Sequence, residues 1–144
     1  MFWTRRNAGA KVRVVANKDG KKDAQYWLGK SMSTVSENEN WVVDRGGLVV
    51  EKKAQSGAAS LNVWERLVYC LWVTDYMMRN AGDFANAVDM YPDFQTDAKR
   101  FAEQLSLRIT CEAFSLPQRK LQQEYFNRFE AICNEIRSVE PNAA

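Results

Sequence analysis

The stretch that decides the fold covers residues 61–84, with the sequence LNVWERLVYCLWVTDYMMRNAGDF. Apolar residues recur at helical spacing on two faces, so the predicted helix is apolar on nearly every side. One face carries Leu61, Trp64, Val68, Leu71 and Trp72, and the other carries Val63, Leu67, Cys70, Val73 and Met77. Such a helix belongs at the centre of a domain, with neighbours on several sides. We expect a scaffold helix of about 19 residues, roughly 28 Å long.

The end of this helix is marked by Asn80, Ala81 and Gly82. Asparagine and glycine suit the left-handed conformation that commonly ends a helix. Asp83 follows, and an aspartate in this position can cap the next helix. The sequence therefore predicts a tight turn directly after the central helix.

Helical stripes continue to the end of the chain. A short helix is predicted after Phe84 and ended by Pro92, and a longer one is opened by Asp93 or Thr96 and runs through Ala113. The last helix follows Pro117, because proline is tolerated in the first turn, and ends before residue 141. We expect a mainly α fold for residues 60–144, a helical bundle of three long helices plus short helices.

Residues 1–59 have a different character and are predicted to form a basic N-terminal arm. Glycine-rich and valine-rich segments here indicate a short β-hairpin or an extended arm. The predicted pieces are a strand at 11–16, a short helix at 23–28, a loop at 31–40, hairpin strands at 41–44 and 48–51 joined by Arg45-Gly46-Gly47, and a linker at 52–60.

Net charge divides the chain at the same place. Residues 1–59 carry eleven Lys and Arg against six Asp and Glu, a net charge of +5, although the whole chain is only +2. A basic arm can contact the phosphates of nucleic acid, and its interleaved aromatic residues can stack on bases. The alternative is a solvated terminus that keeps the protein soluble. The residues placed to contact nucleic acid are Arg5, Arg6, Lys11, Arg13, Lys21 and Lys22.

Residue types that the chain lacks restrict its chemistry. There is no histidine, which excludes Ser-His and Cys-His catalysis, histidine bases and histidine metal ligands. Cys70, Cys111 and Cys133 are odd in number and lie in apolar helical segments. They are expected to be buried, reduced thiols of a reducing compartment. No cofactor and no metal site is predicted, and the leading expectation is a protein that is not an enzyme.

One enzyme alternative comes from Asp44, Glu51 and Lys53. An aspartate on one strand and Glu-x-Lys on the next is the arrangement of a restriction-type nuclease, in which the carboxylates hold Mg²⁺. The non-catalytic interpretation is a solvated hairpin edge, because exposed strand edges are often charged. The nuclease remains the weakest of the three functional alternatives.

Inside the central helix, Asp75 is one turn before Arg79, the spacing of a helical ion pair. It lies among apolar residues, and an unpaired buried carboxylate would be costly. We expect Asp75 to pair with Arg79 or to bond to the backbone at the following turn; a catalytic acid is the alternative.

The segment ERLVYCLWVTDYMMRNAGDFANAV (residues 65–88), followed by two predicted long helices, resembles a family of small bacterial helical domains of unknown function that includes a DNA-mimic protein. The resemblance covers about residues 60–114. That family has an apolar Trp-containing helix, an acidic residue and a turn close to Asn-Asn-Gly-Gly-Phe. Here the second Asn and second Gly of that turn are replaced, and Asn86 stands in place of a glutamine. The resemblance implies a non-catalytic helical protein that binds another protein. Carboxylates and basic residues alternate along residues 93–112, which does not suit DNA mimicry.

The leading hypothesis is thus a non-catalytic, protein-binding helical protein, with an inhibitor or immunity protein of a bacterial system as one form. Nucleic-acid binding through the arm and a metal-dependent nuclease are the alternatives. The N-terminus has charges where a secretory signal needs an apolar run, and four charges interrupt the most apolar stretch, so a cytoplasmic protein is expected. The predicted partner-binding residues are Asp75, Arg79, Asn80, Gly82, Asp83 and Asn86.

Overall fold

The central helix α4 (Val63–Ala81) begins and ends as local chemistry requires. At its start the side chain of Asn62 accepts a hydrogen bond from the backbone N–H of Glu65, and Glu65 accepts one from the N–H of Asn62. This reciprocal pair satisfies two donors that the first turn would otherwise leave free. At its end Gly82 has φ 75° and donates to the carbonyls of Met77 and Met78, so the predicted left-handed cap is confirmed.

A computed structural model describes residues 36–141 of the chain. The chain divides into two units, Met1–Trp41 and Val42–Ala144, so residues 42–59 belong to the same unit as residues 60–144. The described residues are mainly helical and contain no strand. Their elements are α3 (Glu37–Ser56), a short 3₁₀ helix (Ala58–Ser60), α4, α5 (Ala85–Met90), α6 (Phe94–Gln104), α7 (Arg108–Phe114) and α8 (Gln118–Ser138).

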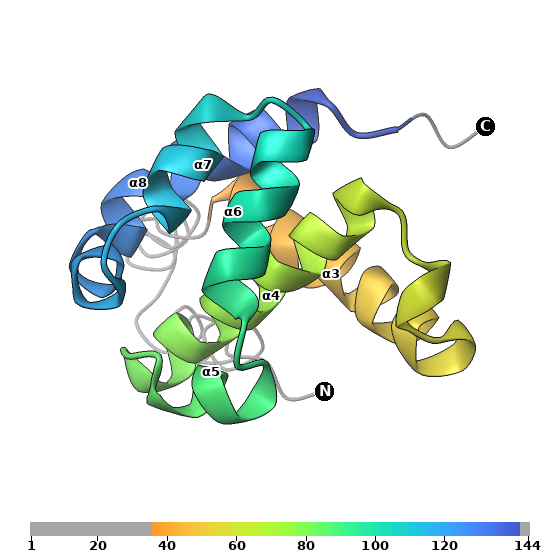
Figure 1. Cartoon of the computed structure of the whole chain (residues 1–144), viewed down its shortest axis with the longest axis horizontal. Helices are drawn as coiled ribbons and strands as arrows, with labels where there is room; N and C mark the ends of the chain where they lie inside the picture. Colours follow the sequence, from red (N-terminus) through yellow and green to blue (C-terminus); the bar gives the residue numbers. More distant parts are fainter. Residues whose placement is uncertain (1–35, 142–144) are drawn as a thin grey trace, which may run out of the picture. The chain divides into compact units, whose positions relative to one another are not determined.

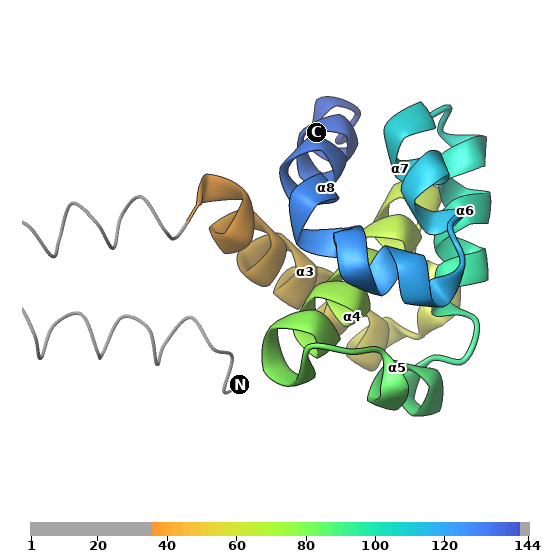
Figure 2. The same cartoon turned by 90° about the vertical axis from the view of Figure 1, so that its left-hand side faces the viewer.

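Within the second unit, α4 is in contact with α5, α6 and α8. Figure 1 shows α6 lying across α4, and Figure 2 places α7 between α6 and α8. Most apolar residues of both predicted α4 faces are buried; Val63 and Trp72 are partly exposed. The core around α4 is completed by Phe84, Phe94, Phe101, Phe114, Leu121, Tyr125, Phe129, Ile132 and Ile136. No described helix is both long enough and apolar enough to cross a membrane.

The hairpin predicted over residues 41–51 is wrong, because these residues are part of helix α3. Val42, Gly46 and Val49 share one helical face and are buried, so the relevant period was that of a helix. Gly46 was interpreted as a turn residue, but it is needed for packing, because a Cβ at this position would lie 2.5 Å from Cδ1 of Trp72. Glycine therefore allows α3 to approach α4 closely and does not make a turn.

The borders of α3 correct two further predictions. The polar run predicted as a loop at 31–40 is helical from Glu37, and Ser36 and Glu39 form a capping box, with Ser36 Oγ accepting from the N–H of Glu39 at 3.1 Å. The predicted linker at 52–60 is helical up to Ser56 and continues into the 3₁₀ turn. The strand predicted at 11–16 and the helix predicted at 23–28 lie outside the described residues.

The second long helix predicted through Ala113 is broken into α6 and α7. Ser106 has φ 59°, the N–H of Leu107 donates to the carbonyl of Ala102, and that of Ser106 donates to Glu103. These two bonds are the pair that ends a helix in a Schellman motif, normally with glycine in the left-handed position. The carboxylate of Glu135 on α8 then accepts hydrogen bonds from the N–H groups of Ile109 and Thr110 at the start of α7.

The two adjacent glycines of α3 give a matched test of the helix contact. We expect Gly46→Ala to destabilise the protein by about 1–3 kcal/mol, because the new methyl group meets the base of the Trp72 side chain. Gly47→Ala has nothing within 4 Å of its new methyl group and should stabilise by about 0.5–1 kcal/mol through helix propensity. Urea unfolding of both variants measures the difference. A stabilising Gly46→Ala would contradict the helical packing described here.

The break at Ser106 can be tested in the opposite direction. Ser106→Gly should stabilise the protein by about 1 kcal/mol, since glycine adopts the left-handed conformation without steric cost. Ser115 ends α7 in the right-handed region at φ −87° and provides the control. Ser115→Gly should give no gain in thermal unfolding. Equal effects of the two substitutions would show that Ser106 is not held in the left-handed conformation.

Candidate functional site

The carboxylate of Asp75 is the most deeply buried charged group among the described residues, with its residue 0% exposed. Nε of Arg79 lies 3.0 Å from both carboxylate oxygens, and the hydroxyl of Tyr125 on α8 donates to Oδ1 at 2.6 Å. The predicted pairing with Arg79 is confirmed, and the Tyr125 bond is an addition that one sequence does not reveal. Charge-assisted hydrogen bonds of this kind offset the cost of removing a carboxylate from water.

Aromatic rings of α8 enclose the other half of this ion pair. The guanidinium carbon of Arg79 lies 4.7 Å from the ring centre of Phe129 and 5.0 Å from that of Phe126. Burial, followed by the nearby Asp75 charge, raises the pKa of Tyr125 well above its ordinary value. Tyr125 therefore remains a neutral hydrogen-bond donor, and the group has the chemistry of a structural link between α4 and α8.

The predicted partner-binding residues do not all lie at the surface. Asn80, Gly82 and Asn86 are exposed, and Asp83 is half-buried and accepts a hydrogen bond from the N–H of Ala85 at the start of α5. Asp75, in contrast, lies in the interior. The turn itself is held from α8, where Oε1 of Gln122 accepts a hydrogen bond from the N–H of Phe84 at 2.9 Å.

Phe126 is a residue that the sequence prediction missed. It is 49% exposed, although it is a large apolar side chain, and its ring makes an edge-on contact with Tyr125 at 5.3 Å. It lies one turn after Gln122 on α8, next to Arg79, so it adjoins the turn after α4. Its exposure could have been predicted from its position on the helix. Phe126 falls outside the apolar stripe of α8, whose members are all buried: Leu121, Tyr125, Phe129, Ile132 and Ile136.

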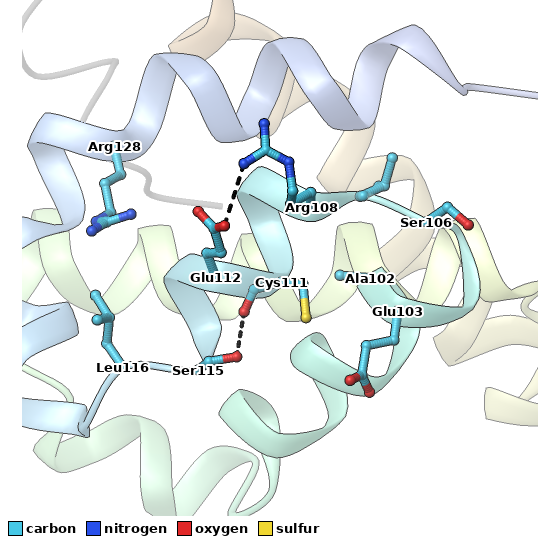
Figure 3. A pocket seen from close by; sticks show the side chains of 10 residues that line it. Ala102, Glu103, Ser106, Arg108, Cys111, Glu112, Ser115, Leu116 and Arg128 are labelled. Atoms are coloured by element: carbon cyan, nitrogen blue, oxygen red, sulfur yellow. Dashed lines mark hydrogen bonds and ion pairs between the residues drawn. The ribbon is translucent and has the colours of Figure 1, made fainter.

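A second feature is an open pocket of about 570 Å³ formed by residues of α6, α7, α8 and the connecting segments (Figure 3). Apolar groups such as Leu107 and Leu116 line it together with charged residues. Arg108 and Glu112 form an ion pair at 3.4 Å on one side of the pocket. Cys111 is partly exposed here, and the hydroxyl of Ser115 donates to its carbonyl. No histidine exists in the chain to activate this thiol.

The other two cysteines are free and buried, as predicted. Desolvation raises the pKa of Cys70 to about 12, and desolvation also raises the pKa of Cys133. A thiol attacks as its thiolate, so both residues are inert near neutral pH. Cys111 departs from the prediction because it is only half-buried.

The nuclease motif loses its structural basis, because the hairpin on which it depended is wrong. Asp44 and Glu51 are exposed on α3 and two helical turns apart, about 10 Å along the axis. Lys53 lies over the ring of Tyr69 at 5.2 Å. Within residues 36–141, no group of three or more acidic or cysteine side chains is placed to hold a metal ion. The arm residues Arg5, Arg6, Lys11, Arg13, Lys21 and Lys22 lie outside the described residues.

Comparisons with protein families, with curated proteins and with solved structures found no match to this chain.

The structural role of Asp75 predicts a large effect of losing one hydroxyl group. Tyr125→Phe should destabilise the protein by about 1.5–3 kcal/mol, because a bond to a charged, buried acceptor is lost. Tyr91→Phe is the matched control: the Tyr91 hydroxyl also donates to a carboxylate at 2.6 Å, but the side chain of that carboxylate, Asp97, is 22% exposed. Its loss should cost less than about 1 kcal/mol in urea unfolding. Equal losses would mean that burial of Asp75 does not determine the cost.

Proposed function

We propose that this chain is a non-catalytic helical protein that binds another protein through the surface beside the turn after α4. This turn surface consists of Asn80, Gly82 and Asn86 from the turn region and Phe126 from α8. The observation that carries the proposal is Phe126, an aromatic side chain that is half exposed and yet held in place by neighbours on two helices.

The turn surface has the chemistry of an interaction site. Aromatic and arginine side chains dominate the energetics of protein interfaces, especially where they are pre-organised. Phe126 contacts Arg79 and Tyr125, and both of these are bound to the buried carboxylate of Asp75. The ring therefore loses little conformational freedom on binding. Asn80 and Asn86 add exposed polar side chains from the turn region, of the kind found at the rim of an interface.

Several groups that would be suited to catalysis are already engaged. Asp75 is paired inside the core, Cys70 and Cys133 are held as neutral thiols, and the chain has no histidine. Every buried side-chain nitrogen and oxygen among the described residues has a hydrogen-bond partner. These observations support a binding role over an enzymatic one.

An inhibitor or immunity protein of a bacterial system remains the form of this function that the resemblance in residues 60–114 favours. Direct mimicry of DNA is not part of the proposal. Mimicry needs rows of unneutralised carboxylates, whereas Asp97 is paired with Arg100 at 2.9 Å and Glu112 with Arg108 at 3.4 Å. A surface of mixed signs projects a weak long-range field.

The proposal is tested by capturing partners from a lysate of the source organism on the intact, immobilised chain. Phe126→Ala should weaken the binding of the captured protein at least about tenfold, the size expected for an interface anchor. Val139→Ala is the control, because Val139 is also exposed, at 40%, but lies about 20 Å further along the axis of α8. Unchanged binding by Phe126→Ala, or no partner bound by the intact chain, would contradict the proposal.

A further inference from the structure

We infer that a second site, separate from the turn surface, binds a small phosphate monoester that carries a planar group. The site is a cavity of about 310 Å³ beside α4. The side chains that could bind a ligand come from α3, α4, α6 and the residue that directly follows α5. The residues that carry the inference are Lys53, Arg66, Tyr69, Tyr91, Asp97 and Arg100, which we call the cationic pocket.

The single carboxylate of these six residues is already occupied. Oδ2 of Asp97 accepts a hydrogen bond from the Tyr91 hydroxyl at 2.6 Å, and Oδ1 accepts one from Arg100 at 2.9 Å. Desolvation alone would raise the pKa of Asp97, but these two bonds and the charge of Arg66 leave that pKa below its ordinary value. Asp97 is thus ionised and fixes Tyr91 and Arg100 in the wall of the cavity.

Two further cations, Arg66 and Lys53, form no ion pair or hydrogen bond with an acidic side chain of the described residues; Arg66 acts on Asp97 only through its charge. Nε of Arg66 donates to the carbonyl of Leu61 at 3.0 Å, which orients the guanidinium and leaves its terminal nitrogens without a hydrogen bond to any described residue. Lys53 lies over the ring of Tyr69, and the neighbouring Lys52, not Lys53, pairs with Glu65. With Asp97 neutralising one of three cations, the cationic pocket has a net charge of +2 from these side chains.

The wall between the cations is aromatic. The rings of Tyr69 and Tyr91 lie 5.6 Å apart with 31° between their planes, and both line the cavity. The two tyrosine rings suit a ligand with a planar, apolar part, since aromatic rings attract one another when they stack or meet edge to face. Guanidinium groups bind phosphate through two parallel hydrogen bonds, and lysine adds a point charge. A dianionic phosphate joined to a planar group satisfies both parts of the pocket.

The test is calorimetric titration of the full chain with phenyl phosphate at low salt, with inorganic phosphate, benzoate and phenol as comparison probes. Phenyl phosphate should bind saturably, with a lower Kd than any of the other three, and added NaCl should weaken its binding. Failure of phenyl phosphate to saturate the protein, or equal binding of benzoate, would overturn the assignment of a phosphate ligand.

Variants locate the binding. Arg66→Gln and Lys53→Gln should each raise the Kd for phenyl phosphate about tenfold or more, because each removes a charge-assisted contact. Arg108→Gln is the matched control, since Arg108 is 79% exposed in its side chain and lies outside the cavity. Thermal unfolding checks each variant, and if Arg66→Gln does not fold, Lys53→Gln decides. Wild-type affinity in Lys53→Gln, or an equal loss in Arg108→Gln, would refute the pocket. These residues are not those of the turn surface, so this result is independent of the protein-binding proposal.

Discussion

The constraint on which the described structure depends is the presence of one carboxylate, Asp75, in the middle of an otherwise apolar helix. A charge at 0% exposure is tolerated only where its partners are placed with good geometry. Arg79 is supplied by the helix itself, one turn later. Tyr125 must come from elsewhere, and this requirement fixes the position of α8 relative to α4.

The same pairing sets the register of the two helices. Nε1 of Trp64 donates to the carbonyl of Ile136, a second bond from α4 to α8. Trp64 and Asp75 are eleven residues apart on α4, and Tyr125 and Ile136 are eleven residues apart on α8, a rise of about 16 Å in each helix. The two helices therefore run antiparallel, with matched hydrogen bonds at both points. Gln122, bonded to the N–H of Phe84, extends this register to the turn after α4. Apolar packing alone would permit several helix positions, whereas directional bonds to a buried charge select one.

Sequence reasoning succeeded where the information was local. The periodicity of residues 61–81, the left-handed Gly82 and the i, i+4 pair of Asp75 and Arg79 all depend on neighbours in the chain, and all three are found in the structure. It failed where tertiary contact overrode local preference. Valines around Gly46 indicated a strand and a turn, because a glycine needed for close approach to Trp72 looks the same in sequence as a turn glycine. The break at Ser106 carried no glycine to mark it, and its stability depends partly on Glu135 from another helix.

The candidate sites were only partly predictable for the same reason. The turn was found, but Phe126 and the convergence of Lys53, Arg66 and Arg100 depend on how the helices meet.

The central claim, that Asp75 serves the fold through its pairing, is tested most directly by a double-mutant cycle between Asp75→Asn and Arg79→Met in urea unfolding. Each single substitution breaks the ion pair and leaves one of its two members without the other, so each should cost about 3–5 kcal/mol. The double variant should cost less than the sum of the two by at least about 2 kcal/mol, because the interaction between the two side chains is lost in each single variant and can be lost only once in the double variant. Strictly additive losses, or a single substitution without effect, would contradict the account.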